Sequence, residues 1–291
     1  MSGTVLVLTA AGTLRRDLAD AAFAAAGASA RRWLDATAAE APVDGADALD
    51  AARAVLADAP VDANIVPEAD RRKRLLIADM DSTIIGCECI DEIADAVGVK
   101  AQVAAITEAA MRGELDFEGA LTERVALLKG LPAETLETVY AERVRLNPGA
   151  AILVRTMAAL GADTALVSGG FTFFSERVGA AAGFSSHRAN TLEIADGRLT
   201  GRVVPPILGR EAKAERLQAL CAAGGYHATD VLALGDGAND LAMIGTAGLG
   251  VAYRAKPAVA AAADTRLEHA DLSAVLHLQG IPQEQWRTAP E

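Results

Sequence analysis

The chain has 291 residues, 52% of them hydrophobic, and a formal net charge of −12. This length and hydrophobicity allow one large core, or one medium and one small core, so we expect two or three compact units and not a disordered chain. The acidic balance argues against nucleic acid and anionic membranes as partners, because both bind clustered Lys and Arg. We therefore expect a small-molecule partner.

No run approaches the ~18 consecutive apolar residues of a membrane span, and the first residues lack the basic region of a signal peptide. We expect a cytoplasmic protein. The three cysteines, Cys87, Cys89 and Cys221, match neither a redox C-x-x-C pair nor a zinc site, so we expect reduced thiols.

Residues 1–70 predict a small α/β unit and its linker. Apolar patterns indicate strands near Val5–Leu8, Ser29–Leu34, Ala38–Pro42 and Ala63–Val66, and helices at Leu14–Ala26 and Ala46–Ala57. This βαββαβ order resembles the ferredoxin-like arrangement of small amino-acid-sensing (ACT) domains. No glycine-rich ligand turn is present, so docking is the expected role. Sensing stays an alternative, and a homodimer through this unit is also considered.

The two polar segments of the chain are expected to be solvated. The linker Pro67–Arg74 contains four consecutive basic residues but no interleaved aromatic residues. We interpret it as a hinge and not as a nucleic-acid patch. Residues 279–291 contain two prolines and several polar side chains, which predicts a loose tail.

Residues 71–291 predict a second domain of α/β class with a Rossmann-like parallel sheet. Its core comprises residues 71–85 and 146–280, in which helical segments separate short apolar runs at Leu75–Ala78, Thr164–Val167, Val231–Leu234 and Leu249–Ala252. Ligands of such sheets bind beyond the carboxyl ends of the strands. The residues that follow these runs are therefore the candidates for function.

A helical cap, residues 86–145, is predicted as an insertion after the first core strand. Helical periodicity covers Ile90–Val97, Lys100–Met111, Phe117–Leu128 and Ala133–Val144, with Pro132 as the expected first helical residue of the last one. A cap beside the catalytic edge excludes water and recognises the part of a substrate that does not react.

Two aspartates, Asp79 and Asp81, follow the first core strand at positions i and i+2. Alternation along a strand would point both carboxylates the same way. Two anions ~4 Å apart repel by roughly 4 kcal/mol at an effective dielectric near 20, and a phosphate adds to this repulsion. The pattern predicts a divalent cation, and Mg²⁺ suits it because Mg²⁺ prefers oxygen ligands. A strand end whose aspartates cap the next turn is the alternative.

Two further motifs follow other core strands. The run S-G-G-F begins at Ser168 and offers a hydroxyl and sterically bare amides such as that of Gly169, which can hold phosphate oxygens. The run G-D-G-A-N-D contributes Asp236, Asn239 and Asp240. It lacks the alternating ligands and terminal Glu of an EF-hand calcium loop.

These motifs, D-M-D-S-T, E-C-I-D-E, S-G-G-F and G-D-G-A-N-D, resemble those of the haloacid-dehalogenase-type phosphohydrolases in type and order. The resemblance covers about residues 75–265. It implies that Asp79 is the nucleophile and that Asp81 is the general acid and base. Metal ligands would be Asp79, the Asp81 carbonyl and Asp236, with Asp240 acting through a water.

The same resemblance implies the groups that bind the substrate. Ser168 and the Gly169 amide would hold the phosphoryl group, and Lys213, near the start of a helix, would neutralise its charge. Asn239 would orient the phosphate or the rest of the substrate.

Two cap residues resemble the family's pair for an amino-acid substrate. Arg124 can grip a carboxylate with two parallel hydrogen bonds and lies two helical turns after Phe117, which could cover the pocket. Glu88 could meet an ammonium group, although Asp91 or Glu92 could replace it. Salt bridges within the cap are the alternative role for these side chains.

The implied function is Mg²⁺-dependent hydrolysis of O-phospho-L-serine to serine and phosphate, the closing step of a serine-forming route. Another small phosphomonoester as substrate, or phosphotransfer to an acceptor, would use the same residues. A signalling receiver domain also collects aspartates and a lysine, but it is about half this size and has no helical cap.

Overall fold

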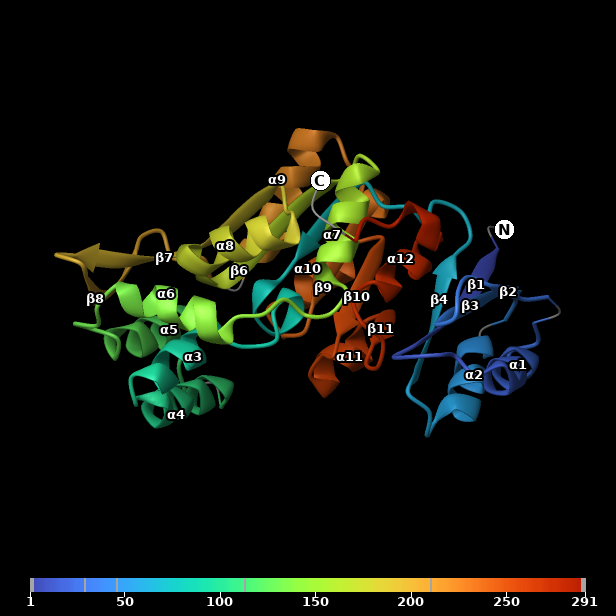
Figure 1. Cartoon of the computed structure of the whole chain (residues 1–291), viewed down its shortest axis with the longest axis horizontal. Helices are drawn as coiled ribbons and strands as arrows, with labels where there is room; N and C mark the ends of the chain where they lie inside the picture. Colours follow the sequence, from blue (N-terminus) through green and yellow to red (C-terminus); the bar gives the residue numbers. More distant parts are fainter. Residues whose placement is uncertain (1–2, 29, 46, 113, 210, 289–291) are drawn as a thin grey trace.

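The computed structural model describes residues 3–28, 30–45, 47–112, 114–209 and 211–288. The chain forms an elongated molecule built on two sheets, one of four strands and one of seven. The small sheet lies at one end, a group of helices lies at the other, and the large sheet lies between them (Figure 1). None of the described helices is long and apolar enough to cross a membrane.

The small sheet is the N-terminal unit, and its order is the predicted βαββαβ. Its elements are β1 (Thr4–Ala10), α1 (Arg16–Ala25), β2 (Arg32–Trp33), β3 (Ala38–Val43), α2 (Ala48–Leu56) and β4 (Val61–Pro67). The strands pair antiparallel in the order β2-β3-β1-β4. Helices α1 and α2 cover one face, and the other face adds Val5, Val7 and Val66 to the core of the large sheet. The predicted starts at Ser29 and Ala46 lie outside the described residues.

The large sheet confirms the predicted Rossmann-like core. From edge to edge its strands are β11 (Thr265–Leu267), β10 (Leu249–Tyr253), β9 (Val231–Gly235), β5 (Leu75–Ala78), β6 (Asp163–Phe171), β7 (Ser186–Ala195) and β8 (Arg198–Val204). All neighbours from β11 to β7 are parallel, and β8 pairs antiparallel with β7. The four predicted runs are β5, β6, β9 and β10.

Helices cover both faces of this sheet, because its central strands are apolar on both sides. They are α7 (Ala150–Ala159), α8 (Thr172–Ala182), α9 (Ala212–Gly224), α10 (Leu241–Thr246), α11 (Pro257–Ala262) and α12 (Ala274–Leu278). Leu76 packs in the cluster that holds α7 and α8, whereas Leu75 and Ile77 pack toward Leu217 of α9 and Met243 of α10. Because β5 is buried on both faces, packing holds its position, and with it the position of the residues that follow its carboxyl end.

The four predicted cap helices are present as α3 (Cys89–Ala96), α4 (Lys100–Met111), α5 (Phe117–Ala126) and α6 (Glu134–Arg143). The chain enters the cap after β5 and leaves it before α7, and the two crossings pair at Ile85 and Leu146. The predicted start of the last helix was wrong. Pro132 forms a β-bridge with Arg198, and α6 begins two residues later.

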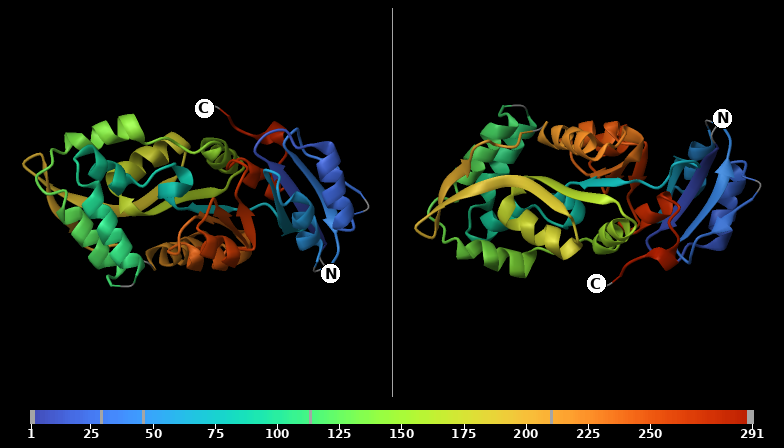
Figure 2. Two further views of the ribbon diagram at one scale, coloured as in Figure 1. Left: turned by 90° about the horizontal axis from the view of Figure 1, so that it is seen from below. Right: turned by 90° about the horizontal axis from the view of Figure 1, so that it is seen from above.

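The hairpin of β7 and β8 was not predicted, and it extends from the large sheet alongside the cap helices (Figure 2). Leu199 N–H donates to Leu131 O, and Leu199 O accepts from Gly130 N–H at 2.8 Å. Ala133 N–H donates to Gly197 O at 2.9 Å. The loop between α5 and α6 is therefore held by backbone hydrogen bonds to the core.

The linker is not the predicted solvated hinge. Arg71 is 10% exposed at its side chain, and its guanidinium donates to Leu278 O and His277 O and pairs with Glu40 at 2.9 Å. Both carbonyls lie at the C-terminal end of α12, and the arginine fork donates to each of them; His277 O also accepts from Gly280 N–H at 2.9 Å. Lys73 Nζ donates to Asp70 O and to Thr229 O. The basic run is thus part of a contact between the two sheets.

Side chains of β4 extend this contact to the edge of the large sheet. Asn64 is fully buried, donates from Nδ2 to Arg266 O at 2.8 Å and accepts from Arg266 N–H at 2.9 Å. The Asp62 carboxylate accepts backbone N–H groups just after β11. The N-terminal unit is therefore joined to the core by buried, paired polar groups.

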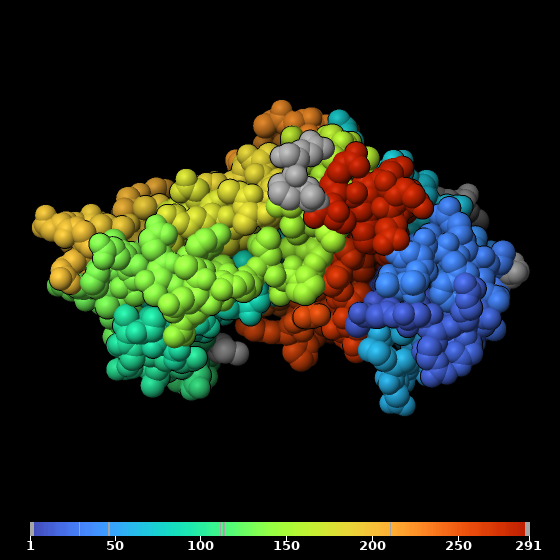
Figure 3. All heavy atoms as spheres, in the orientation of Figure 1, coloured from blue at the N-terminus to red at the C-terminus, as the bar shows by residue number. Residues whose placement is uncertain are grey.

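The predicted loose tail is also wrong for its described part. Gln279 is 1% exposed and accepts from Lys73 N–H, and Trp286 donates to Ile281 O with its ring 4.9 Å from that of His277. In Figure 3 this C-terminal segment (red) lies against the N-terminal unit (blue). Ile281 and Trp286 pack against the core of the large sheet, although the prolines of this segment had suggested a loose tail. Residues 289–291 lie outside the described residues.

Candidate active site

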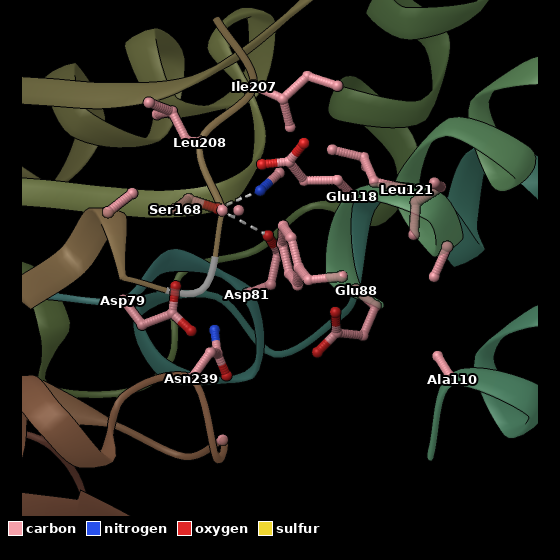
Figure 4. A pocket seen from close by; sticks show the side chains of 18 of the residues that line it. Asp79, Asp81, Glu88, Ala110, Glu118, Leu121, Ser168, Ile207, Leu208 and Asn239 are labelled. Atoms are coloured by element: carbon pink, nitrogen blue, oxygen red, sulfur yellow. Dashed lines mark hydrogen bonds between the residues drawn. The ribbon is translucent and has the colours of Figure 1, made fainter. Parts of the chain in front are cut away.

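A cavity of about 1350 Å³ lies between the carboxyl ends of β5, β6 and β9 and the cap. Its lining includes nearly all of the predicted site residues: Asp79, Asp81, Glu88, Arg124, Ser168, Gly169, Asp236 and Asn239. In Figure 4 the side chains of Asp79, Asp81, Glu88 and Asn239 face the same space. Lys213 lines a small pocket beside it.

Asp79 and Lys213 form a buried ion pair at the end of β5. Asp79 Oδ1 accepts from Met80 N–H at 2.7 Å and lies 2.8 Å from Lys213 Nζ. Lys213, in the first turn of α9, also donates to Asp240 Oδ1 at 2.6 Å. Burial raises the pKa of Asp79, Asp240 adds to the rise, and Lys213 opposes it. Burial would lower the pKa of Lys213, but these two carboxylates bring it above its ordinary value.

Asp81 faces the cavity, but not through the predicted alternation along a strand. The strand has already ended, and the turn Met80–Ile84 presents this side chain; Ile85 N–H donates to Met80 O across the turn, and the backbone is non-helical at Asp81 and Ser82. Ser82 in that turn has φ of +55°, which lies in the left-handed region. The chain reversal, and not the strand period, therefore brings the second carboxylate to the site.

Hydrogen bonds fix the orientation of the Asp81 carboxylate. Oδ1 accepts from Cys89 N–H at 2.8 Å, and Oδ2 accepts from Ser168 Oγ at 3.1 Å (Figure 4). Burial and then the nearby charge of Glu88 raise the pKa of Asp81 to about 6, while the N–H and hydroxyl donors oppose the rise. A carboxyl group with this pKa can carry a proton near neutral pH.

Asp79, Asp236 and Asp240 bring one oxygen each to within 4.8 Å of one another. Thr83 Oγ1 donates to Asp236 Oδ1 at 3.2 Å. Burial and the charge of Asp240 raise the pKa of Asp236 to about 6. Three buried carboxylates this close repel one another, and their hard oxygens fit a divalent cation such as Mg²⁺.

The three carboxylates of this set differ in their exposure to the cavity. Asp240 is fully buried, and its Oδ2 accepts from the N–H groups of Asp236 and Gly237 while its Oδ1 accepts from Lys213. Asp79 and Asp236 line the main cavity. Asp240 does not line the cavity, and it contacts Lys213 and the backbone of Asp236 instead.

The glycines after Ser168 are required by close approaches. A Cβ on Gly169 would lie 2.9 Å from Phe117 Cζ, and one on Gly170 would lie 2.7 Å from Asp81 Oδ2. Gly170 N–H donates to Ser168 Oγ at 2.8 Å. The Phe117 ring of the cap can lie against the phosphate-binding turn only because side chains are absent there.

The predicted substrate-binding pair of the cap lines the cavity. Arg124 is half-buried, donates from Nε to Ala120 O, and has its pKa lowered by burial. Glu88 accepts from Ser82 Oγ at 2.7 Å. Asp91 also lines the cavity, whereas Glu92 pairs with Arg143 at 3.0 Å.

Two contributing side chains were not predicted. Thr83 is fully buried and contacts Asp236, and its place two residues after Asp81 in D-M-D-S-T is a signal that could have found it. Asn190 contacts the Gly169 carbonyl from β7. It follows no apolar run and belongs to no motif, so the sequence holds no local signal for it.

A mostly parallel sheet flanked by helices, with carboxylates at its carboxyl edge, a buried lysine beside them and a helical cap above, is the architecture of capped hydrolases with a Rossmann-like core. The chain belongs to the haloacid dehalogenase-like hydrolase family, whose sequence profile matches residues 76–245.

Within this family, the chain is similar to proteins named phosphoserine phosphatase. The chain is 49% identical over 219 residues to a phosphoserine phosphatase of Streptomyces coelicolor, a match that covers 75% of this chain and 53% of that protein. It is 50% identical over 210 residues to the phosphoserine phosphatase of Polaromonas sp., which covers 70% of this chain and 89% of that protein. The chain thus spans about half the length of the first relative and most of the second.

A solved structure of a phosphoserine phosphatase holding an analogue of a phospho-aspartyl intermediate aligns with a TM-score of 0.65 and 39% identity. The alignment covers 71% of this chain and 98% of that one.

Proposed function

We propose that this chain is a phosphatase that hydrolyses O-phospho-L-serine to L-serine and phosphate, the closing step of a serine-forming route. The observation that carries the proposal is the buried pairing of Asp79 with Lys213, with Asp81 facing the same cavity. The names of the relatives support phosphoserine as the substrate.

Residues 71–291 would form the phosphatase domain, and residues 1–70 would dock on it. A homodimer through the N-terminal unit would use its helices or its β2 edge, because the other face of its sheet packs on the core.

Mg²⁺ would be held by the carboxylates of Asp79 and Asp236 and by the Asp81 carbonyl, with Asp240 in support. When bound, the ion offsets the charge of the carboxylates and of the substrate phosphate. This set suits Mg²⁺ because every donor is an oxygen and few protein ligands are used.

In the first half-reaction, a carboxylate oxygen of Asp79 attacks phosphorus and the bond from phosphorus to the serine oxygen breaks. Asp81 donates its proton to that oxygen, which is a poor leaving group as an alkoxide. Its pKa of about 6 suits a group that must give up a proton and later regain it.

In the second half-reaction, Asp81 accepts a proton from a water that attacks phosphorus. The bond from phosphorus to Asp79 breaks, and phosphate leaves with Asp79 restored as a carboxylate. Lys213, the Ser168 hydroxyl and the Gly169 N–H would hold the phosphoryl oxygens throughout.

Selection of serine would depend on the cap. Arg124 would bind the substrate carboxylate, and Glu88 would meet its ammonium group. Asn239 would orient the bound phosphate or serine. Phe117 would cover the reacting group and exclude water.

A panel of phosphomonoesters tests this function. Phosphate release is measured on phosphoserine, phosphoethanolamine and phosphoglycolate, with Mg²⁺ and after chelation. We expect the highest kcat/KM on phosphoserine and no release without Mg²⁺. Added free serine separates hydrolysis from phosphotransfer, since transfer would form new phosphoester instead of phosphate. Equal rates on all three substrates, or rates indifferent to chelation, would contradict the proposal.

A further inference from the structure

Asn190 bridges two segments of the active site that the backbone ladder does not join. It lies on β7 with 1% of its surface exposed. Its Nδ2 donates to Gly169 O at 2.9 Å, and its Oδ1 accepts from Leu208 N–H at 2.7 Å. Both ends of the amide are used, so turning it over would set donor against donor and acceptor against acceptor.

The first contact replaces a missing sheet hydrogen bond. The pairing of β6 with β7 loses its register between Val167 and Phe171, the stretch that contains the phosphate-binding turn. The Gly169 carbonyl is thereby left to a side chain, and Asn190 supplies the donor. Gly169 is half-buried, and a carbonyl there that lost its donor would destabilise the turn, so the turn is held where this donor lies.

The peptide between Gly169 and Gly170 is consequently held at both ends. Asn190 holds its carbonyl, and Ser168 Oγ accepts from its N–H at 2.8 Å. The Ser168 hydroxyl in turn donates to Asp81 Oδ2. A shift of this peptide would therefore move the phosphate-binding amide of Gly169 and the partner of the acid Asp81 together.

The second contact reaches the segment that leads to Lys213. Leu208 lines the cavity and is 7% exposed, and Lys213 follows five residues later in the first turn of α9. Asn190 thus connects the turn that would hold the phosphoryl oxygens to Leu208, which lies five residues before the lysine that would neutralise their charge.

We propose that Asn190 is a positioning residue for phosphoryl transfer, which sets the phosphate-binding turn and the segment before Lys213 in one geometry. This proposal rests on the proposed phosphatase function. Asn190 does not line the cavity, so it acts through Gly169 and Leu208 and not by contact with substrate.

The test compares wild type with Asn190→Ala and with Asn190→Leu, which keeps the side-chain volume if the alanine variant fails to fold. Asn64→Ala is the matched control, because Asn64 is also buried and also bridges two backbone groups, but at the contact between the sheets. kcat and KM for phosphoserine, inhibition by inorganic phosphate and thermal unfolding are measured for each.

For the Asn190 variants we expect kcat to fall about 10- to 100-fold, because a small misplacement of groups around the transition state can cost this much. KM should change less than about threefold, since the cap binds the amino-acid part, and inhibition by phosphate should weaken. Asn64→Ala should lower the melting temperature by a similar amount while kcat stays within twofold.

Wild-type kcat retained in a folded Asn190 variant, or equal loss of kcat in the Asn64 control, would overturn the proposal and leave the phosphatase function intact. A wild type that releases no phosphate would contradict the function itself, and this proposal with it.

Discussion

Arg124 is the residue that should separate recognition of serine from the chemistry of its phosphate. We expect Arg124→Ala to lower kcat/KM on phosphoserine, because a bidentate contact to the carboxylate is lost. The loss should correspond to about 2–5 kcal/mol of transition-state stabilisation. Phosphoethanolamine, which has no carboxylate, should be affected little. Arg124→Lys should fall between, since an ammonium cannot form two parallel hydrogen bonds.

Arg112→Ala is the control for that comparison, as Arg112 is an exposed cap arginine paired with Glu114 outside the cavity. Steady-state kinetics on both substrates provide the measurement. Equal losses on phosphoserine and phosphoethanolamine would remove Arg124 from substrate recognition.

The carboxylates also predict how Mg²⁺ binding depends on pH. Asp81 and Asp236 have pKa values of about 6, above the value near 3.9 of an unfolded chain. Without metal, the folded state binds these two protons more tightly than the unfolded chain does. The resulting contribution to the free energy of unfolding is complete below about pH 4 and is lost as the pH rises through 6. Mg²⁺ binds the ionised form, so it should raise the melting temperature more at pH 7.5 than at pH 5.

Thermal unfolding with and without Mg²⁺ at the two pH values measures this difference. Asp236→Asn removes one ligand and should reduce the Mg²⁺ effect at both. The same Mg²⁺ shift at pH 5 and pH 7.5 in the wild type would argue against a site built from these carboxylates.

Residue types at the site could be predicted well, whereas their local geometry could not. Asp79, Ser168 and Asp236 each follow an apolar run, and that signal is contained in the neighbouring sequence. Asp81 was assigned to the site through strand alternation, but a turn with a left-handed residue presents it. Asn190 depends on a break in register between two strands, which no single segment of sequence records.

At the scale of elements, the hairpin of β7 and β8 is the main feature that prediction missed. Its strands are largely exposed and have no continuous apolar run. The Asp196-Gly197 pair in its turn is a hairpin signal that could have indicated it. By contrast, β5 and β9 are buried on both faces and read as unbroken apolar runs.

Gly201 of this hairpin tests whether the hairpin supports the cap. Its φ is +80°, and an added Cβ would lie 2.9 Å from Lys129 Cβ and 3.3 Å from Ala126 O. Gly201→Ala should therefore displace α5, lower stability by more than the about 1–2 kcal/mol of a left-handed alanine, and raise KM for phosphoserine.

Gly197→Ala is the matched control, since Gly197 has φ of +71° in the same hairpin but open space around it. It should have the backbone cost alone and a wild-type KM. Unfolding curves and steady-state kinetics are measured for both variants. Equal changes of KM in the two would show that the hairpin does not position the cap through Gly201.

At the scale of the whole molecule, the N-terminal unit and the core of the large sheet are joined by more contacts than the composition of the linker suggested. A run of four basic residues is typical of a solvated linker, yet only the tertiary structure reveals that Arg71 contacts the last carbonyls of α12 and the buried Glu40. The overall α/β architecture was predictable because each half has its own apolar pattern. Their contact is made of isolated polar side chains that form no pattern.

Arg71→Ala should lower the free energy of unfolding by about 3 kcal/mol. This is the lower end of the range for losing one partner of a buried ion pair, because Glu40 still pairs with Arg32. Cleavage near the linker by added protease should become faster. Arg72→Ala, at the exposed neighbouring position, should change stability by less than about 0.5 kcal/mol. Equal protease resistance in the two variants would show that Arg71 does not hold the units together.

The central claim is that Asp79 carries the phosphoryl group during turnover. Its most direct test is to react the protein with labelled phosphoserine, quench it in acid and locate the label by mass spectrometry, in wild type and in Asp79→Asn. The variant should fold, since Lys213 keeps Asp240 as a partner. We predict label on the Asp79 peptide of the wild type, and in the variant no label and phosphate release reduced at least about a thousandfold. Label on another residue, or wild-type turnover by Asp79→Asn, would contradict the account.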